Sequence, residues 1–552
     1  MEDDRSQTSY AGRWVARLHG RVIAQGGTPE LARRAAKSSR YKETPEIIYM
    51  PVSLQLPPLV DKVRAALPDQ EMYLVGGAVR DMLLGRFSRD LDFALPSNGI
   101  SLARRVARAL DADFMILDDE RDTGRVIVTG EDGARTFLDF ATYRGGAELE
   151  SDLQARDFTI NALAYDLRAE AILDPLEGAA DIRTKRIRAC APTSFTDDPV
   201  RVLRAVRQAA ELGFQIEKET RGWMKQAAGQ VGRVSPERQR DELFKMLEGP
   251  KPDASIRALE ILGVLPQLLP ELVTLKGVEQ SSPHVHDVWI HTLSVLKHLE
   301  AILAALAVGY NADSTNDLYT GLLTFRIGRY RQQFADHFAA ALNADRSLRA
   351  LLFFAALYHD IAKPQTRTVE ANGRVRFLGH DAQGVDIAAH RAEEFHLSND
   401  EIQRLRLIVA HHMRFHSMTS RMEREQQEPS RKAIYRFFRD GEEAGPDLVL
   451  LGLADLRATQ EQNLKQEDWG IALDVARILL ENYWEKREEA VAPLRLVDGR
   501  DLMNELKLEA GPMIGQLLEA IREAQAMGRV ETREQAFDFA RIWLKENRDK
   551  IV

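Results

Sequence analysis

The pattern of apolar residues changes once along this 552-residue chain, near residue 175. Before that point, short apolar runs such as EMYLVGG, LDFAL, RVIVTG and RTFLDFATYR are broken by Gly and Asp, as is typical of strands. From Asp181 onward, nearly every stretch has the period of helices. A chain of this length also needs several cores. The sequence therefore predicts an α+β protein, in which a head with a mixed β-sheet precedes an all-α neck, a helical body and a helical tail.

Local signals divide the chain into segments. A hairpin around His19-Gly20, a helix capped by Thr28 and the strand-like run EIIYMPV indicate a small accessory αβ unit. A helix is expected from Leu54 to Leu67, and the neck helices should end at Gly213 and begin at Ser235-Pro236. Loops are expected at 310–318 and 422–431. We expect an accessory unit at 1–52, a head at 53–175, a neck at 176–275, a body at 276–480 and a tail at 481–552.

Composition excludes several classes of protein. The net charge of −9 argues against wholesale coating by nucleic acid, although residues 183–207 hold seven Arg or Lys against two acids. That stretch is either a polyanion site or a solvated helix face. The run Leu348–Tyr358 is too short to span a bilayer, and MEDDRSQTSY lacks the features of a signal peptide, so we expect a cytoplasmic protein. The one cysteine, Cys190, leaves neither an intrachain disulfide nor a cysteine zinc site.

Two aspartates in the run SRDLDFAL are the first candidate site. Asp90 and Asp92 are two positions apart at the start of a predicted strand, so their carboxylates should project from one face. Like charges this close favour a cation between them, and Mg²⁺ together with nucleotide phosphates would satisfy both. An isolated pair of this kind is otherwise only solvated acid. Asp139, on the predicted strand TFLDFATYR, is either a third carboxylate of the site or a structural acid.

The upstream glycines favour the catalytic interpretation. Gly76 and Gly77 end a strand and open the helical run AVRDMLLG, where bare backbone amides can approach a phosphate. Arg80, one turn into that helix, could add charge or pair with Asp81. Neither a dinucleotide fingerprint nor a P-loop is present. Glycines beside paired aspartates predict nucleotidyl transfer.

Four motifs in order carry a family resemblance. The run LVGGAVRDMLLGR followed by DLD, then RDFTINALAYD, DDPVRVLRAVR and ERQRDELFKML resembles the class II tRNA nucleotidyltransferases and bacterial poly(A) polymerases, the CCA-adding type of enzyme, over residues 55–270. This resemblance implies a nucleotidyltransferase head that uses Mg²⁺, transfers CMP and AMP from CTP and ATP to a tRNA 3′ end without a template, and releases pyrophosphate. No DNA or membrane partner is expected, and the oligomeric state stays open.

The resemblance also implies residue roles. Asp90 and Asp92 would be the metal-binding catalytic pair, and Gly76, Gly77 and Arg80 would lie near the triphosphate. Asp198 and Arg201 would read the base edge, because a carboxylate accepts from an exocyclic amine and an arginine donates to the ring; Asp198 is otherwise a plain helix N-cap. The further residues implied to bind the nucleotide are Arg156, Asp157, Asn161, Arg204 and Arg207.

Two departures from the family pattern bear on the product. Ala155 precedes Arg156-Asp157 where relatives often have a second arginine, which removes one anchor. The link after Arg144, GGAELESDLQ, is shorter than the flexible loop of many full CCA-adding members. In the family, a missing loop accompanies enzymes that add only the two cytidines. Addition of CC alone is therefore one hypothesis, beside CCA addition and poly(A) addition.

The helical body contains a second candidate site. The runs DVWIHTLSVL, LYHDIAKP, GHDAQG, VAHHMRF and LGLADLRAT resemble the HD phosphohydrolase superfamily. The resemblance implies a metal site, and imidazole with carboxylate suits Mn²⁺, Ni²⁺, Fe or Mg²⁺. The aligned residues are His291, His359, Asp360 and Asp455, with His380 and either His411 or His412 as further candidates. Such a site would hydrolyse a phosphoester, although lone histidines are often structural.

Other classes of function stay open at this point. The chain could be a metal-dependent HD phosphohydrolase whose head merely binds nucleotide, or an RNA-binding protein with a decayed site. Retention of Asp90, Asp92, Asp198 and Arg201 argues against decay. Gly511-Pro512, in the tail, is either a phosphate-binding helix start or a plain one.

Overall fold

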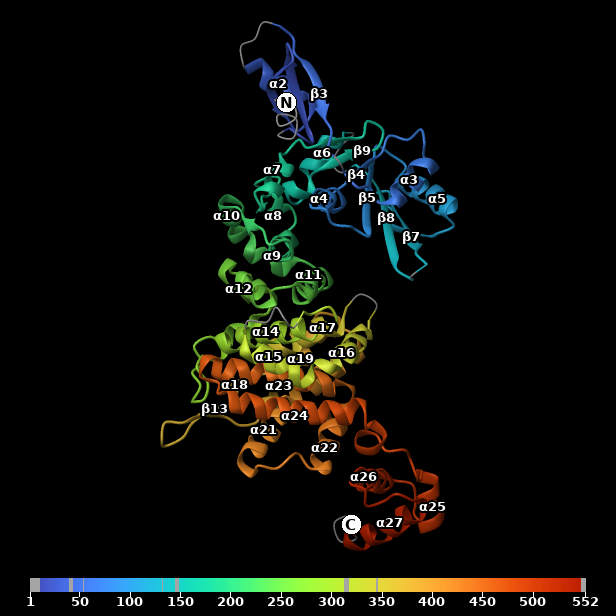
Figure 1. Ribbon diagram of the computed structural model, residues 1–552, viewed down its shortest axis with the longest axis vertical. Coiled ribbons are helices and arrows are strands. Elements are labelled where there is room, and N and C mark those ends of the chain that lie inside the picture. Colours follow the sequence, from blue (N-terminus) through green and yellow to red (C-terminus); the bar gives the residue numbers. More distant parts are fainter. Residues whose placement is uncertain are drawn as a thin grey trace. The chain divides into compact units, whose positions relative to one another are not determined.

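The computed structural model describes residues 10–38, 43–52, 54–131, 133–143, 148–311, 317–343 and 346–547, in two compact units, 1–233 and 234–552 (Figure 1). The mixed sheet of the first unit and the helical second unit confirm the predicted α+β class. Residues 144–147 of the short link and 312–316 of the expected loop lie outside the described residues.

A seven-stranded sheet forms the centre of the first unit, in the order β10-β9-β4-β5-β8-β7-β6. β5 and β8 are parallel and the other neighbours antiparallel, so the sheet is mixed. Helix α5 packs on β7 and β8, and Phe93 stacks on Phe140 in the core. The strands are β4 (Tyr73–Val75), β5 (Asp90–Leu95), β6 (Asp113–Asp118), β7 (Thr123–Thr129), β8 (Arg135–Thr142), β9 (Ala164–Asp166) and β10 (Ala171–Leu173), and the helices among them are α3 (Pro58–Ala66), α4 (Gly77–Leu83), α5 (Gly99–Leu110) and α6 (Leu149–Gln154).

The accessory unit covers the edge of this sheet. It comprises the predicted hairpin β1 (Arg13–Leu18) and β2 (Arg21–Gly26), helix α2 (Pro29–Ser38) and strand β3 (Glu46–Met50). The Trp14 indole donates to the carbonyl of Ile172 at 3.1 Å, and the Tyr49 hydroxyl accepts from the Ile172 amide at 3.1 Å. The Asp174 amide donates to the Gly27 carbonyl at 2.8 Å. The unit therefore satisfies backbone groups of edge strand β10 that would otherwise face water.

Helices follow the sheet, with two corrections to the expected pattern. Helix α3 begins at Pro58 rather than Leu54, because Pro57 precedes it and disfavours a helical conformation for its neighbour. A two-stranded parallel pair, β11 (Arg186–Ile187) and β12 (Gln215–Ile216), interrupts the stretch expected to be purely helical. The elements here are η1 (Thr159–Asn161), α7 (Gly178–Arg183), α8 (Ser194–Asp197), α9 (Val200–Leu212), which ends at Gly213 with φ +68°, and α10 (Lys218–Ala227).

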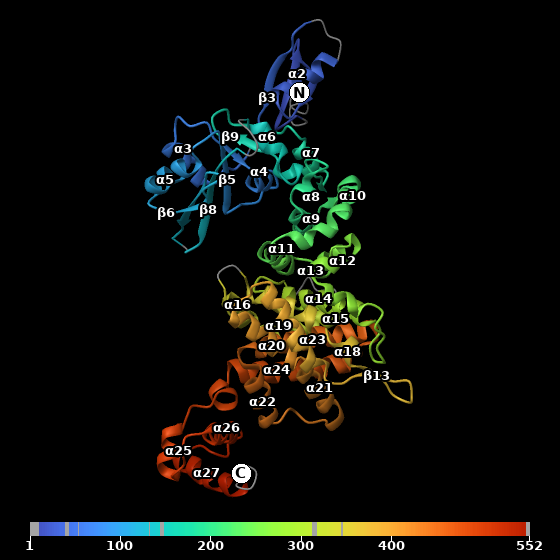
Figure 2. The same cartoon turned by 180° about the vertical axis from the view of Figure 1, so that it is seen from behind.

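The second unit is helical except for a small hairpin, β13 (Arg367–Val369) and β14 (Val375–Phe377) (Figure 2). Ser235 precedes α11 as predicted, but its side chain makes no capping hydrogen bond. The expected loop at 422–431 is shorter, because α21 continues to Glu425. The first helices are α11 (Pro236–Glu248), α12 (Pro252–Leu262), α13 (Leu265–Leu268), α14 (Val288–Ala305), α15 (Leu318–Ile327), α16 (Arg331–Ala339), α17 (Leu348–Tyr358), α18 (Lys363–Thr366) and α19 (His380–Glu394). The remaining ones are α20 (Asn399–His411), α21 (Met413–Glu425), α22 (Arg431–Gly441), α23 (Gly445–Gln460), α24 (Gln466–Trp484), α25 (Gly499–Leu506), α26 (Pro512–Ala526) and α27 (Arg533–Asn547).

Helix α14 lies in the core of the second unit. It packs against α17 and α23, and its start is capped by Asp287, which accepts from the Ile290 amide at 2.8 Å. By length and composition it would pass for a membrane span, but 72% of it is buried inside the structure. Its apolar character is therefore explained by core packing, and His291 is carried into that core.

Candidate active site

The paired aspartates lie where the sheet has its one parallel pairing. In β5, Asp90 is exposed and Asp92 half-buried, whereas Leu91 and Phe93 between and after them are buried on the other face. Asp92 is opposite Val75 on β4 and opposite Asp139 on β8. The two carboxylates therefore share one face, as the spacing predicted.

Gly76 lies at the point where three parts of the site converge. Its φ is +77°, a conformation that favours glycine. A Cβ at this position would lie 2.9 Å from Arg156 Nη1 and 3.1 Å from Asp92 Oδ2. A side chain here would therefore displace the tip of Arg156 and crowd Asp92, in addition to the strain of the positive φ.

Asn161 connects three side chains behind this turn. Its Oδ1 accepts from Arg80 Nη1 at 2.7 Å, and its Nδ2 donates to Asp157 Oδ1 at 3.0 Å and to Gln208 Oε1 at 3.0 Å. Arg80 also forks onto Asp81 at 2.9 and 3.0 Å, which is the pairing that the sequence offered as one alternative. The arginine is fixed in place beside Gly77.

The carboxylate of Asp157 is buried and ionised. Burial opposes ionisation, but Arg204, Asn161 and the Phe158 amide outweigh it and lower the pKa of Asp157. Arg204 Nε lies 3.2 Å from Asp157 Oδ2. Asp157 therefore connects the RDFTINALAYD segment to helix α9 through Arg204.

Arg156 and Arg201 meet at the same junction. Arg156 donates to Asp152 Oδ2 at 3.1 and 3.0 Å, so helix α6 positions it. Arg201 donates to the carbonyls of Ala155 at 2.9 Å and of Arg156 at 3.3 Å. The guanidinium of Arg201 is thereby held by the backbone of the segment that carries Arg156.

The other two residues of the DDPVR motif region differ in their surroundings. Asp198 is half-buried, and its Oδ1 lies 3.4 Å from the Val200 amide, a long hydrogen bond at the start of α9. Arg207 lies one turn beyond Arg204 and binds Glu211 on its own helix at 2.9 and 3.1 Å. The structure thus brings Asp90, Asp92, Gly76, Arg80, Arg156, Asn161 and Arg201 into one connected region and gives Arg207 an acidic partner of its own.

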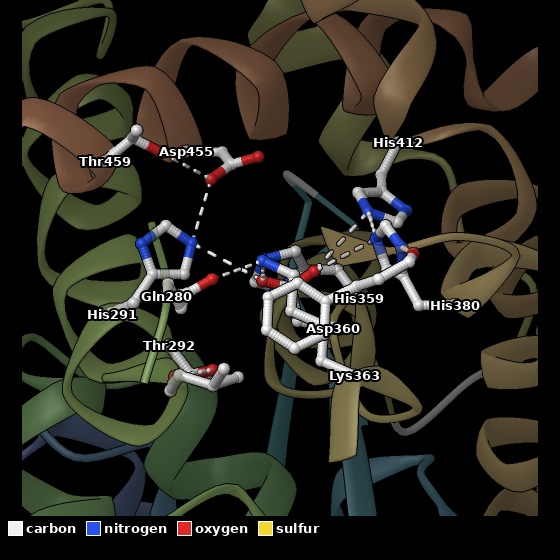
Figure 3. Close-up of polar contacts among 12 residues, drawn as sticks. Gln280, His291, Thr292, His359, Asp360, Lys363, His380, His412, Asp455 and Thr459 are labelled. Carbon is white, nitrogen blue, oxygen red and sulfur yellow. Dashed lines mark hydrogen bonds and ion pairs between the residues drawn. The ribbon is translucent and has the colours of Figure 1, made fainter. Parts of the chain in front are cut away.

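A second cluster, of histidines and aspartates, lies in the core of the second unit (Figure 3). Asp360, two residues after the end of α17, is its centre. Its Oδ2 lies 3.1 Å from His359 Nε2 and 3.6 Å from His291 Nε2, and its Oδ1 lies 3.3 Å from His380 Nε2 and 3.7 Å from His412 Nε2. All five side chains are buried.

Three of these imidazoles are oriented in the same way. The Nδ1 atoms of His359, His380 and His412 bind the carbonyls of the residues three positions earlier, at 2.7, 2.6 and 2.7 Å. A carbonyl only accepts, so each Nδ1 carries a proton, and each Nε2 faces Asp360. Burial also lowers the pKa of His412, which keeps that ring neutral.

Asp455 and Lys363 complete the cluster. Asp455 Oδ1 lies 2.9 Å from His291 Nε2, and Oδ2 lies 2.6 Å from His416 Nε2. Lys363 Nζ lies 2.6 Å from Asp360 Oδ2 and donates to Gln280 at 2.7 Å. Burial opposes the charge of both aspartates, but the surrounding His and Lys groups hold both pKa values well below the usual range. The cluster opens into a cavity of about 760 Å³ whose rim includes Arg374 and Arg376.

The cluster fits a divalent metal. Among the described residues, His291 Nε2, His359 Nε2 and Asp360 Oδ2 are buried without a properly directed hydrogen bond. Buried polar atoms without partners are costly, and converging imidazole nitrogens with a carboxylate are the donors that such metals take. The expected alternative between His411 and His412 is decided by geometry: His412 belongs to the cluster, whereas the surroundings of His411 include Arg414 and Asp440.

Comparison with known proteins gives matching domains in the same order. The chain matches the poly A polymerase head domain over residues 72–188, the probable RNA- and SrmB-binding site of polymerase A over 213–275, the HD domain over 288–455 and tRNA nucleotidyltransferase domain 2 over 491–540. It is 32% identical to a CC-adding tRNA nucleotidyltransferase of Thermus thermophilus over 484 residues, covering 86% of this chain and 94% of the relative. The chain belongs to the tRNA nucleotidyltransferase family.

Other relatives of this tRNA nucleotidyltransferase differ in the product that their names state. An A-adding enzyme of Deinococcus radiodurans is 31% identical over 86% of this chain and 95% of its own length. A CC-adding enzyme of Geobacter sulfurreducens is 42% identical over 35% of this chain and 44% of its own. A CCA-adding enzyme of Thermotoga maritima solved with tRNA has a TM-score of 0.52 at 21% identity, covering 89% of this chain and 97% of its own, and shows the fold alone.

Sequence reasoning missed several residues of both sites in this nucleotidyltransferase. Arg125 pairs with Asp139 on the sheet, Asp152 positions Arg156, and Gln208 binds Asn161. In the second unit, Lys363 and His416 contact the two aspartates. A cross-strand pairing scheme for RVIVTG and TFLDFATYR could have found Arg125; the other contacts depend on how elements pack.

Proposed function

We propose that this tRNA nucleotidyltransferase transfers CMP from CTP to a tRNA 3′ end and stops after two cytidines. The supporting observation is the short connection between the sheet and Arg156. Strand β8 ends at Thr142, and helix α6, which positions Arg156 through Asp152, already begins at Leu149. Only residues 143–148 separate these elements, which leaves no length for the long loop that accompanies full CCA addition in the family.

In the proposed reaction, the tRNA 3′-hydroxyl attacks the α-phosphorus of CTP and pyrophosphate leaves. Asp90 and Asp92 would hold Mg²⁺, which lowers the pKa of the attacking hydroxyl and neutralises charge on the leaving group. Arg80 and Arg156, held by Asn161 and Asp152, donate to the triphosphate oxygens beside Gly76. The base is selected by Asp198 and Arg201, the latter fixed by backbone carbonyls so that its donors keep one direction.

The product-length assay tests this proposal. A tRNA transcript that ends at the discriminator base is incubated with CTP, with ATP, or with both, and the products are resolved at single-nucleotide resolution. We expect two additions that need only CTP, and no third with ATP. A three-nucleotide product, addition of A alone to a transcript ending in CC, or a long A tail would each overturn the CC assignment.

A pair of variants connects the product to the head site. Asp90→Asn with Asp92→Asn should reduce incorporation at least about a thousandfold, because both carboxylates proposed to hold the metal are lost. Asp111→Asn is the matched control, since Asp111 is exposed at the end of α5 with φ +49°, a conformation that Asn tolerates. Equal loss in the control would show a folding defect instead.

A second activity is favoured by the buried cluster of the second unit. We infer a metal-dependent phosphohydrolase there, because the Nε2 atoms of three oriented imidazoles converge on Asp360 below a cavity with arginines at its rim. The residues of this cluster would hold a divalent ion, Mn²⁺, Ni²⁺, Fe or Mg²⁺, which would supply an activated water for phosphoester hydrolysis. Lys363, which donates to Gln280 and lies beside Asp360 in the lining of the cavity, would stabilise the charge of the phosphate.

Hydrolysis and transfer can be separated by mutation. Phosphatase and 2′,3′-cyclic phosphodiesterase activities are measured with Ni²⁺ or Mn²⁺ for the wild type and for Asp360→Ala, with Asp386→Ala as the control on the exposed side of α19. Loss in Asp360→Ala alone supports the proposal. Equal activity in all three, or none in any, contradicts it, whereas the Asp90/Asp92 variant should keep full hydrolysis. A cytoplasmic location for both activities stays our expectation.

A further inference from the structure

A row of charged side chains crosses three strands of the head sheet. Asp92 on β5 is directly opposite Asp139 on β8, and Asp139 is directly opposite Arg125 on β7. Residues opposite one another in neighbouring strands project from the same face. The third candidate carboxylate therefore lies between the catalytic pair and a cation.

Arg125 is held in a fixed geometry. Its Nε and Nη2 donate to Asp139 Oδ1 and Oδ2, both at 2.7 Å, which is the forked arrangement that only arginine makes. Its guanidinium also lies over the ring of Phe137, 5.0 Å from the centroid, and Phe137 is the register neighbour of Asp90. The side chains of Arg125 and Asp139 are 31% and 21% exposed, so solvent screens the pair only in part.

The position of Arg125 changes the net charge around a metal ion bound at Asp90 and Asp92. The hydrogen bond from Arg125 to Asp139, and the negative charges of Asp139, Asp90 and Asp92, all raise the pKa of Arg125, so it is a permanent cation. Without Arg125, the carboxylates of Asp90, Asp92 and Asp139 would give this face a net charge of about −3. With Arg125, the net charge is about −2. A single divalent ion balances that charge.

We propose that Arg125 is a positioning residue of the transfer site, which keeps Asp139 in a forked ion pair and thereby leaves the cation to Asp90 and Asp92. Asp139 then lies beside the metal-binding pair, and its charge is compensated by Arg125. Arg125 sets how tightly the free enzyme holds its metal before a nucleotide arrives. This inference rests on the proposed metal-binding role of Asp90 and Asp92.

Mutations of Arg125 and of Asp139 should change the affinity for Mn²⁺ in opposite directions. Arg125→Gln removes the cation and releases a carboxylate beside Asp92, so the affinity of the free enzyme for Mn²⁺ should rise roughly three- to tenfold, as expected for one charge a few ångströms away at a partly exposed site. Asp139→Asn leaves Arg125 uncompensated, so the affinity should fall by a similar factor. The double variant should return close to the wild type, and Arg125→Lys, which keeps the charge but not the fork, should lie between wild type and Arg125→Gln.

The experiment measures free Mn²⁺ by electron paramagnetic resonance with the full-length enzyme and no nucleotide. All variants carry Asp360→Ala, which removes binding at the second cluster, and circular dichroism checks the fold of each. A rise for Arg125→Gln with a fall for Asp139→Asn supports the proposal. Unchanged or reduced affinity in Arg125→Gln, or a fall in both variants, overturns it. If Arg125→Gln does not fold, Arg125→Lys takes its place: a smaller rise in affinity supports the proposal, and an unchanged or reduced affinity overturns it.

Two further readouts separate this inference from the proposed function. Asp90→Asn with Asp92→Asn in the same background should abolish the tight Mn²⁺ site, and its persistence would refute the metal-binding pair itself. In steady-state kinetics, Arg125→Gln should shift the Mn²⁺ concentration for half-maximal rate while the KM for CTP changes less than about twofold. A role in folding alone would move neither value selectively.

Discussion

The side chains of Arg80 and Asn161, distant in sequence, are joined by a hydrogen bond of 2.7 Å beside the glycine turn. Asn161→Ala removes this bond and those to Asp157 and Gln208, and leaves the guanidinium with its contacts to Asp81 but without its anchor on Asn161. We expect kcat/KM for CTP to fall about 10- to 100-fold, the equivalent of one or two buried hydrogen bonds, mainly through KM. Steady-state kinetics on a tRNA transcript measure this.

A neighbouring exposed amide serves as the control for that experiment. Gln154→Ala, at the end of α6, loses only a 3.3 Å bond to Glu150 on the surface. Its kinetics should match the wild type within about twofold. If Asn161→Ala behaved in the same way, the role given to the Arg80–Asn161 bond would be wrong.

The accessory unit should separate from the sheet when Gly27 gains a side chain. A Cβ on Gly27 would lie 1.7 Å from the carbonyl oxygen of Asp174, and no flexible side chain is there to yield. We expect Gly27→Ala to raise hydrogen exchange throughout β1–β3 and to cost several kcal/mol of docking free energy, as overpacking of a fixed backbone does. Gly222→Ala on α10, where nothing lies within 4 Å, should be neutral or slightly stabilising.

The stability of the β10–α7 turn should depend on pH through Asp174. Burial raises the pKa of Asp174 to about 6, despite the amide donors Gly178 and Ala179. Because the folded pKa lies above the unfolded value of 3.8, the fold favours the protonated form, and a penalty develops as the pH rises from about 4 through 6, to at most about 3 kcal/mol. Relative to Asp174→Asn, the wild type should lose protection of those amides over this range.

Hydrogen exchange of Gly178 and Ala179 at pH 4.5, 5.5 and 6.5 checks this difference. Above about pH 7 the difference between wild type and Asp174→Asn should stay constant, because Asp174 is fully ionised there. A difference that is flat from pH 4.5 to 6.5 would show that Asp174 stays charged in the fold.

Adjacent histidines offer a matched test of the second site. His412→Ala removes a nitrogen that points at Asp360 and should weaken Ni²⁺ binding at least about tenfold, a typical cost for losing one ligand or its support. His411→Ala, one position earlier and outside the cluster, should leave binding unchanged. Isothermal calorimetry in an Asp90→Asn, Asp92→Asn background isolates this site; equal loss in both variants would indicate a folding effect.

The strongest predictions from sequence concern neighbours along the chain. Asp90 and Asp92 share a face because strand side chains alternate, and helix α9 ends at Gly213 because glycine adopts the left-handed conformation at low cost. The order of the motifs also indicated the family before any fold was known. The short elements β11, β12 and β9 escaped prediction, since two or three residues carry no periodic signal.

The contacts that decide chemistry come from packing between distant segments. Arg125 meets Asp139 only because β7 and β8 pair in one particular register, and a shift of β7 by one residue would put Arg125 on the face of the sheet opposite Asp139. His412 rather than His411 joins the cluster, because neighbouring positions where α20 passes into α21 point in different directions and only tertiary packing determines which one faces Asp360. Sequence alone thus determined which residue types and local faces were available, through the repeat of strand and helix, whereas the tertiary structure decided which charges lie together, because that depends on the register of strands and the rotation of helices.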